Sequence, residues 1–234
     1  MARATLQDDL LNELGSRIVR GLYPTGQLLV TDQLESEFDV SRTVVRETLK
    51  VLESMRLVQL RRALGIVVLP TERWNVFDPR VIGWRLSTDA RTEQLRTLTE
   101  LRAAIEPSAA RSAARFATVE QRAELVEIAH RLTTLAESQG NDQQIADFLL
   151  TDVAFHRLLL HSSGNEMFAA LDEVVEQVLR GYESGPHGHS AVPPGKGPRL
   201  HVEVAEAVAA GDAARAGERM REIFADIDAR LEEQ

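Results

Sequence analysis

Apolar residues recur at helical spacing through almost all of residues 92–232, and this pattern constrains the fold more than any other feature. Glycine, asparagine and aspartate interrupt it, as at Gly140–Asn141, Gly164–Asn165 and Gly211–Asp212. Such residues are typical of helix ends and of the turns between helices. No run in this part alternates as a half-buried strand would. We therefore expect an antiparallel all-α bundle of six or seven helices. The expected helices cover residues 92–116, 118–138, 141–162, 165–183, 198–210 and 212–232.

The beginning of the chain has a different organisation. Leucines at helical spacing predict a first helix that ends near Gly21. Thr31 is placed to cap a short second helix, which runs to about Phe38. Ser41 is a good N-cap for a third helix, which runs to about Met55. Two β-like runs, VQL and IVVL, then predict a small hairpin. Three helices followed by a hairpin is the order of a winged helix-turn-helix.

Charge is distributed unevenly along the chain. The net charge is −9, yet residues 1–70 hold nine basic and nine acidic residues and are neutral. Residues 71–234 hold 18 basic and 27 acidic residues, so the excess of negative charge lies there. Within residues 40–70, six basic residues accompany only two acidic ones. This asymmetry indicates two domains with different partners.

The third expected helix carries the residue types that read DNA. A recognition helix places its N-terminal residues against base edges in the major groove. Arginine suits guanine because its planar fork donates to both O6 and N7, while hydroxyls and the helix N-terminus bind phosphate. The alternative is a solvated helix with scattered arginines, which the agreement of cap, turn and wing disfavours. The expected DNA contacts are Ser41, Arg42, Thr43 and Arg46 on this helix and Arg61 and Arg62 on the wing.

The segment VSRTVVRETLKVLE, with its flanks, resembles the N-terminal domain of the GntR family of bacterial transcription factors. In that family two recognition-helix arginines contact the operator, and they match Arg42 and Arg46. A glycine of the family's wing matches Gly65. Many members also have a DNA-contacting arginine early in the second helix, where this chain has Asp32. This departure indicates a different operator preference.

Residues 72–91 connect the two parts and contain both tryptophans of the chain, Trp74 and Trp84. A connector with aromatic residues and an internal proline is expected to be packed. Its segment WNVFDPRVIGWR resembles members of the FadR-type branch, whose ligands include sugar acids.

An aspartate and a histidine lie one helical turn apart in the second part of the chain. Asp152 and His156 share one face of the helix expected at 141–162, which is apolar on more than one side. Buried polar groups need partners. Carboxylate and neutral imidazole together suit Zn²⁺, Ni²⁺ or Mn²⁺, and His201 on a later helix would face them across the bundle. A structural hydrogen bond between the first two residues is the alternative that the spacing leaves open.

Residues 92–232 resemble the FCD domain, the effector domain of FadR-type GntR regulators. The matching segments are LRAAIEPSAARSAA, DVAFHRLLLHSSGN and HVEVAEAVAAGDAARAGERM. Many FCD domains bind a divalent metal through an aspartate, a histidine one turn later and two further histidines. Asp152, His156 and His201 match the first three positions, and the fourth falls on Ile223, which cannot bind metal. The resemblance implies either a metal site completed by water or effector oxygens, or a pocket that works without metal.

Arg102 lies beside an apolar stripe of the first helix of this part. An arginine in that position either reaches water or pairs, and a salt bridge with Glu106 is one interpretation. The other is bidentate capture of a ligand carboxylate, because the matching arginine of FCD regulators often lines the effector cavity. The expected effector-binding residues are Arg102, Asp152, His156 and His201.

Composition removes several classes of function. The chain has no cysteine, which excludes disulfides, cysteine-bound zinc, iron–sulfur clusters and thiol catalysis. It has no apolar run long enough to span a membrane and no signal-peptide core at its start. We therefore expect a cytoplasmic protein without a membrane partner.

The expected function is ligand-responsive transcriptional regulation, most simply repression of a catabolic operon. A winged helix-turn-helix in residues 1–71 would bind operator DNA, and residues 92–234 would bind effector and form a homodimer. A homodimer matches a pseudo-palindromic operator, from which a small carboxylate or sugar-acid metabolite would release it. A metal-dependent bundle enzyme and a dimerisation module that senses nothing are the alternatives. No general acid or base is evident in addition to the metal ligands, so we do not expect an enzyme.

Overall fold

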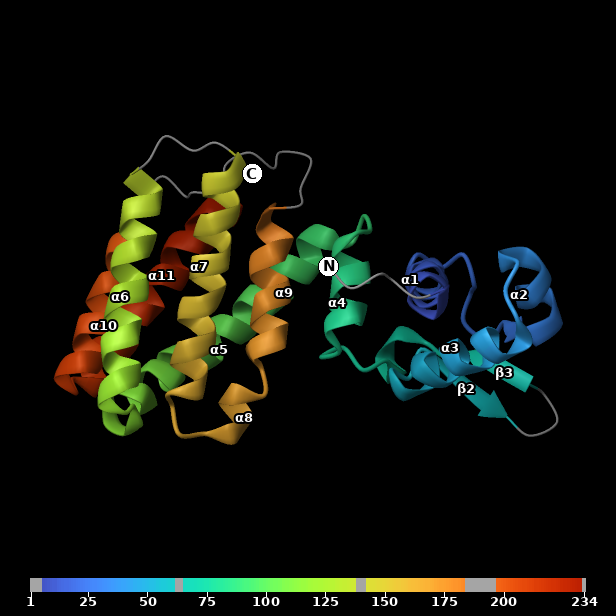
Figure 1. Ribbon diagram of the computed structural model, residues 1–234, viewed down its shortest axis with the longest axis horizontal. Coiled ribbons are helices and arrows are strands. Elements are labelled where there is room, and N and C mark those ends of the chain that lie inside the picture. The colour runs from blue at the N-terminus through green and yellow to red at the C-terminus, as the bar shows by residue number, and fades with distance from the viewer. Residues whose placement is uncertain (1–5, 62–64, 138–141, 184–196, 233–234) are drawn as a thin grey trace. The chain divides into compact units, whose positions relative to one another are not determined.

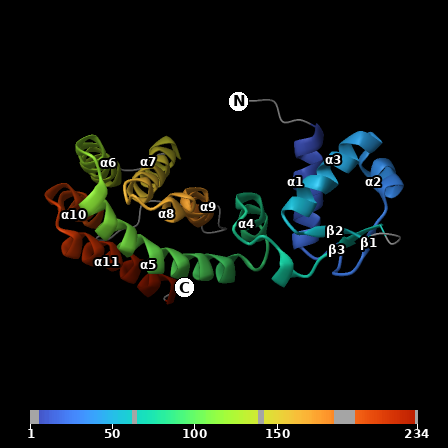
Figure 2. The ribbon, with the colours of Figure 1, turned by 90° about the horizontal axis from the view of Figure 1, so that it is seen from below.

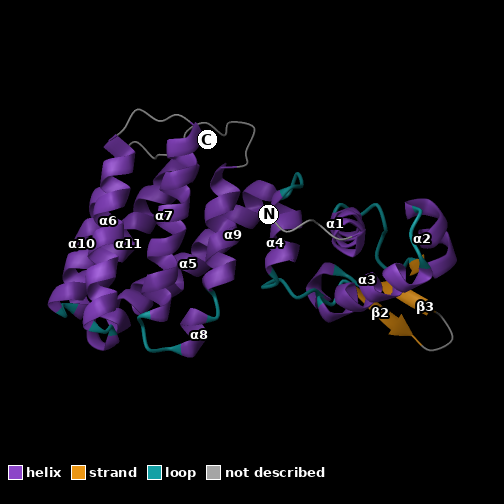
Figure 3. Ribbon diagram, in the orientation of Figure 1, coloured by secondary structure: helices purple, strands orange, loops and turns teal. Residues whose placement is uncertain are grey.

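The computed structural model describes residues 6–61, 65–137, 142–183 and 197–232 (Figure 1). The chain divides into two compact units, Met1–Gln94 and Leu95–Gln234. Most described residues of both units are helical, and the three strands of the described chain lie in the first unit (Figure 3). The predicted mainly helical fold is therefore confirmed.

The first unit is a winged helix-turn-helix, as the sequence predicts. Its elements are α1 (Leu6–Val19), β1 (Leu28–Leu29), α2 (Thr31–Phe38), α3 (Arg42–Ser54), β2 (Val58–Arg61), β3 (Gly65–Val68), the 3-10 helix η1 (Thr71–Arg73) and α4 (Pro79–Leu86). Helices α1 and α3 contribute Leu14, Val45 and Leu52 to its core, and all three side chains are fully buried. The sheet is antiparallel and has the order β1-β3-β2.

The predicted N-cap of α3 is confirmed, whereas the predicted N-cap of α2 is wrong. Ser41 is the N-cap of α3, and its hydroxyl accepts a hydrogen bond from the backbone N–H of Val44 at 3.4 Å. Val30, and not Thr31, is the N-cap of α2, and no side chain caps this helix. The chain enters α2 directly from β1, whose pairing with β3 keeps Val30 extended, so Thr31 is already helical.

Strands β2 and β3 form the predicted hairpin, in which Arg61 lies opposite Gly65. Gly65 has a φ of +99°, in the region that favours glycine. Strand β1 was not predicted, because a strand of two residues is too short to show an alternating pattern. It forms only through its long-range pairing with β3.

Residues 72–91, which we expected to connect the two domains, include a helix that is packed on α1. Asp78 caps this helix, α4, through its carboxylate. Trp84 approaches α1 so closely that a Cβ built on Gly15 would lie 2.3 Å from its ring. The indole N–H of Trp74 donates to a backbone carbonyl just after β3, at 2.9 Å. Both tryptophans therefore hold this segment against the winged helix-turn-helix.

The second unit is a helical bundle, which confirms the prediction. Its helices are α5 (Arg91–Phe116, which begins just before the unit boundary), α6 (Val119–Glu137), α7 (Asp142–His161), α8 (Glu166–Ala169), α9 (Asp172–Glu183), α10 (Gly197–Ala210) and α11 (Ala213–Glu232). Helix α6 packs between α7 and α10, α9 packs on α7, and α11 on α10. Figure 2 shows α5 beside α11, where a Cβ on Gly217 would lie 3.0 Å from the carbonyl oxygen of Pro107. The single helix expected at 165–183 is two helices, α8 and α9.

One arginine joins the ends of two helices of the bundle. The last four carbonyls of a helix have no partner within it. The guanidinium of Arg122 donates to the carbonyls of Ala114 at 2.8 Å and Ala117 at 3.0 Å, at the end of α5. It also donates to those of Val208 at 2.6 Å and Ala209 at 3.0 Å, in the last turn of α10. This contact fixes α5 relative to α10, and these two helices carry residues of the candidate site.

Candidate functional site

Three polar side chains from two helices meet inside the second unit. Asp152 and His156 come from α7, and His201 comes from α10. The Nε2 atom of His201 lies 3.2 Å from Nε2 of His156 and 3.2 Å from Oδ1 of Asp152. The Nε2 atom of His156 lies 3.5 Å from the same oxygen. Both histidines are buried, so the structure brings together the three residues singled out in the sequence as metal ligands.

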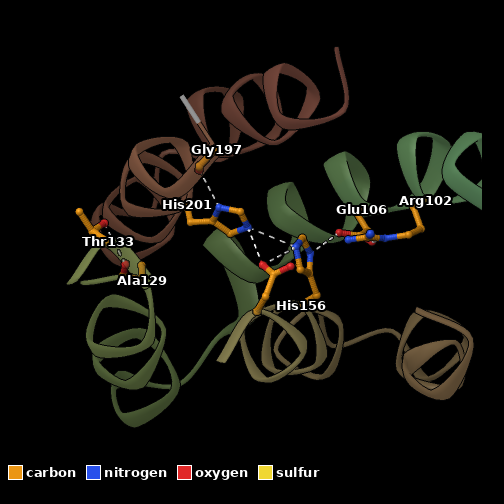
Figure 4. A network of polar contacts seen from close by, with 8 residues as sticks. Arg102, Glu106, Ala129, Thr133, His156, Gly197 and His201 are labelled. Carbon is orange, nitrogen blue, oxygen red and sulfur yellow. Dashed lines mark hydrogen bonds and ion pairs between the residues drawn. The ribbon is translucent and has the colours of Figure 1, made fainter. Parts of the chain in front are cut away.

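The outer nitrogen of each histidine has an acceptor. Nδ1 of His201 lies 2.7 Å from the carbonyl oxygen of Gly197, and Nδ1 of His156 lies 2.5 Å from Oε2 of Glu106 (Figure 4). A carbonyl and an ionised carboxylate can only accept, so each Nδ1 donates its hydrogen. In the neutral imidazoles both Nε2 atoms then present lone pairs, to each other and to the carboxylate of Asp152. Three acceptors this close require a positive charge between them, either a proton or a metal ion.

The three residues fit a divalent metal ion. A zinc ion binds histidine nitrogen at roughly 2.0–2.1 Å, so two such ligands in tetrahedral geometry lie about 3.3 Å apart. The 3.2 Å between the two Nε2 atoms agrees with that spacing. Metal-bound histidines usually donate the other N–H to a carboxylate or a backbone carbonyl, as His156 and His201 do. Ile223, at the position of the expected fourth ligand, is buried among apolar side chains and offers no donor atom.

An arginine and a glutamate of α5 lie behind the histidines. Arg102 and Glu106 are 1% and 0% exposed, and Nε of Arg102 donates to Oε1 of Glu106 at 2.6 Å. The structure therefore contains the salt bridge that was one of the two interpretations of Arg102. The predicted contact of Arg102 with an effector stays a prediction. The sequence indicated Glu106 only as a partner of Arg102, and nothing in its spacing pointed to His156.

Charge within this buried group is balanced by contacts between its members. Burial alone would raise the pKa of Glu106, but the charges of Arg102 and His156 lower it to about 2. Burial also opposes ionisation of Asp152, whereas contacts with His156 and His201 hold its pKa well below the ordinary value. Burial disfavours the charged form of His156, yet the charge of Glu106 raises its pKa. Both carboxylates are therefore ionised at neutral pH.

The residues predicted to bind DNA lie in the first unit, on α3 and the wing. Arg42, Thr43 and Arg46 are exposed in the first two turns of α3, while Val45 and Leu49 face the core. The two arginines are four residues apart and share one face of the helix. Ser41 is exposed at the N-cap, and Arg61 and Gly65 are exposed where β2 ends and β3 begins. Arg62 lies outside the described residues.

Among the helices of the described ranges, none is both long and apolar enough to cross a bilayer.

Comparisons with known proteins agree with this division. The family described as "Bacterial regulatory proteins, gntR family" matches residues 6–68, and the family described as "FCD domain" matches residues 97–226. The Galactonate operon transcriptional repressor of Escherichia coli K12 is 30% identical over 174 residues, which are 74% of this chain and 73% of that protein. The uncharacterized HTH-type transcriptional regulator YieP of the same organism is 28% identical over 77% of each chain.

A solved structure shows the same fold over the whole chain. It is Lar, described as controlling the expression of the Listeria monocytogenes agr system, with a TM-score of 0.59 and 17% identity. The alignment covers 100% of this chain and 99% of that one.

Proposed function

Because this chain belongs to the GntR family of bacterial regulatory proteins and is a transcriptional regulator with an FCD domain, not an enzyme, we propose that it is a ligand-released repressor. The observation that carries this proposal is the convergence of Asp152, His156 and His201 on one point inside the FCD unit. A buried group of acceptors that needs a cation is a binding site, and a module that only dimerises has no use for one.

DNA binding is assigned to one face of the first unit. Arg42 and Arg46 contact base edges in the major groove, and Ser41, Thr43 and the N-terminus of α3 contact phosphate. Arg61, Arg62 and Gly65 of the wing contact the backbone or the minor groove. One recognition helix reads few base pairs, so a homodimer on a pseudo-palindromic operator supplies the remaining specificity.

Effector binding is assigned to the buried site of the second unit. Asp152, His156 and His201 hold a divalent cation (Zn²⁺, Ni²⁺ or Mn²⁺), which when bound supplies a Lewis-acidic centre for oxygen ligands. Within the described part of the chain three protein ligands converge at this point, which leaves room for an effector oxygen. The effector site includes Arg102 in addition to these three residues.

The charges of the site favour an anion of single charge. Arg102 and Glu106 neutralise each other in direct contact, which leaves the negative charge of Asp152. A divalent cation makes the site positive by one unit, and one carboxylate then completes neutrality in a buried environment. A sugar acid or a short hydroxy acid has this charge and additional oxygens for the metal. The name of the galactonate operon repressor, to which this chain is similar, points to the same class.

The test begins with a selection of DNA sites from randomised duplexes, using the purified full-length chain. Sugar acids and hydroxy acids are then screened by thermal shift with and without Zn²⁺, and each hit is added to the protein–DNA complex. We expect a hit that raises the melting temperature and releases the DNA, since ligand and DNA must weaken each other equally. A wild-type chain that enriches no sequence, or hits that leave DNA affinity unchanged, would refute the proposal.

Two variants separate the two sites. Arg42→Ala with Arg46→Ala should abolish DNA binding without changing the melting temperature, and Arg20→Ala, an exposed arginine of the same unit, is the matched control. His156→Ala should retain DNA binding and lose release by the hit.

A further inference from the structure

Glu106 lies between the guanidinium of Arg102 and the imidazole of His156, and each of its two carboxylate oxygens accepts a hydrogen bond from one of them. Oε1 accepts from Nε of Arg102 at 2.6 Å, and Oε2 accepts from Nδ1 of His156 at 2.5 Å. The carboxylate is 0% exposed, so water does not compete for either contact. The guanidinium of Arg102 also stacks on Phe224, with its central carbon 5.2 Å from the ring centroid. This packing fixes Arg102, which in turn holds the Glu106 carboxylate.

The direction of one hydrogen bond decides whether His156 can bind a metal. A neutral imidazole has one N–H, and a ligand nitrogen must be free of hydrogen. Because a carboxylate cannot donate, Glu106 keeps the hydrogen on Nδ1 and leaves the lone pair on Nε2, which faces Asp152 and His201. Without this acceptor the imidazole has no reason to prefer that form or that orientation.

The three ligands and their supporting pair come from different helices. Asp152 and His156 lie on α7, His201 lies on α10, and Arg102 and Glu106 lie on α5. None of the predicted ligands comes from α5. The hydrogen bond between Glu106 and His156 joins α5 to one of these ligands.

We propose that Glu106 is the positioning residue of the cation site, that Arg102 holds its carboxylate in place, and that the contact of Glu106 with His156 couples occupancy of the site to α5. This inference rests on the cation site of the proposed function. Occupancy fixes His156, the fixed imidazole holds the carboxylate, and the carboxylate holds α5. A cation therefore orders α5 together with α7 and α10, although α5 contributes no ligand.

The experiment measures two quantities on the full-length chain with Zn²⁺ as the probe. Calorimetry gives the Zn²⁺ affinity, and amide hydrogen exchange gives the protection that Zn²⁺ adds to each helix. For Glu106→Gln we expect Zn²⁺ to bind about 10- to 100-fold more weakly, as is usual when the partner of a metal-bound histidine is lost. The protection added to α5 should disappear, while that of α7 and α10 returns at saturating Zn²⁺.

The same helix offers a matched control. Arg96 and Glu100 form an ion pair of the same spacing on α5, but their side chains are 54% and 62% exposed. Glu100→Gln should leave both Zn²⁺ affinity and the protection of α5 unchanged. Glu106→Gln leaves the charge of Arg102 buried without its partner and can destabilise the fold. The double variant Arg102→Met with Glu106→Gln removes both charges, so no unpaired charge is buried. A loss of Zn²⁺ affinity and of α5 protection in this variant is then due to the loss of the Glu106 carboxylate.

The outcomes separate this inference from the proposed function. Wild-type Zn²⁺ affinity and wild-type protection of α5 in a folded Glu106 variant would overturn the role of Glu106 alone. If the wild-type chain binds no Zn²⁺, or if His201→Ala binds it as well as the wild type does, the cation site is refuted and this inference with it.

Discussion

A carboxylate oxygen of Asp32 lies 3.3 Å from Nη1 of Arg42, so the first residue of α3 is paired with an acid of α2. Glu35, one turn later on α2, places an oxygen 3.9 Å from Nε of the same guanidinium. The N-terminus of a helix carries partial positive charge, which disfavours a cation there. The two carboxylates offset this effect and orient Arg42. The pair links the departure from the GntR pattern at Asp32 to an arginine proposed to read DNA.

Asp32→Asn should weaken discrimination between DNA sequences. The asparagine no longer orients Arg42 and no longer repels nearby phosphates, so binding to unselected DNA strengthens more than binding to the selected site. An exposed ion pair is worth about 0.2–1 kcal/mol, so we expect a change of up to about fivefold in the ratio of the two affinities. Fluorescence anisotropy on both duplexes at two salt concentrations measures it.

Asp9→Asn is the matched control for this prediction. Asp9 is also an exposed aspartate in the first turn of a helix, α1, so its loss changes the net charge equally. If both variants give the same affinity ratio, the effect is one of net charge and Asp32 has no role in discrimination.

Arg122→Lys should destabilise the second unit. The guanidinium donates to carbonyls at the ends of both α5 and α10, and one ammonium group cannot reach both sets. Hydrogen bonds from a charged group contribute about 1.5–3 kcal/mol each, and these are partly exposed, so we expect a loss of about 2–4 kcal/mol. Urea unfolding measures it, with Arg131→Lys, an exposed arginine of the same helix, as the control. Equal midpoints for the two variants would contradict the role of Arg122.

Gly15→Ala should destabilise the first unit, although the same change stabilises most helices by about 1 kcal/mol. The new Cβ would lie 2.3 Å from the ring of Trp84, so either the indole or α4 itself must shift away from α1. Overpacking of this kind costs about 1–3 kcal/mol. Trp84→Phe in the same chain should recover part of the loss, and the melting temperatures of the wild type, Gly15→Ala and the double variant check this. A higher melting temperature for Gly15→Ala alone would show that α4 is not held against α1.

The sequence predicted most of the helices and the residues of the site, but not all of the contacts that organise it. The spacing of Asp152 and His156 placed them on one face of a helix, because that relation is local. The meeting of His201 with them depends on how α7 and α10 lie in the bundle, which no local pattern fixes, and the resemblance to FCD domains supported the expectation that His201 faces them. Glu106 has no local sign of its contact with His156, since the two are 50 residues apart.

Boundaries were harder to predict where no glycine or proline marks them. The expected helix at 165–183 is interrupted at Ala170 and Leu171, between α8 and α9. Both residues are good helix formers, so propensity favours continuity there. After the break, α9 packs on α7. Tertiary packing decides this boundary.

Ile223→His should strengthen the binding of Zn²⁺ and weaken the metal-free fold. Ile223 is 4% exposed, so a histidine there buries a polar ring at a cost of about 1–3 kcal/mol when no metal is bound. If the position matches the fourth ligand of FCD domains, Zn²⁺ repays that loss by binding the new imidazole. Thermal unfolding in chelator and in Zn²⁺ should show a lower melting temperature than wild type in the first and a larger rise on adding metal.

Ile223→Gln distinguishes a new ligand from a merely polar side chain at this position. Its amide is comparable in size and is a poor ligand for zinc, so it should lose stability in chelator without the additional rise in Zn²⁺. The same Zn²⁺-dependent rise in both variants would mean that the histidine does not reach the ion. The side chain of residue 223 would then lie outside the coordination shell that Asp152, His156 and His201 begin.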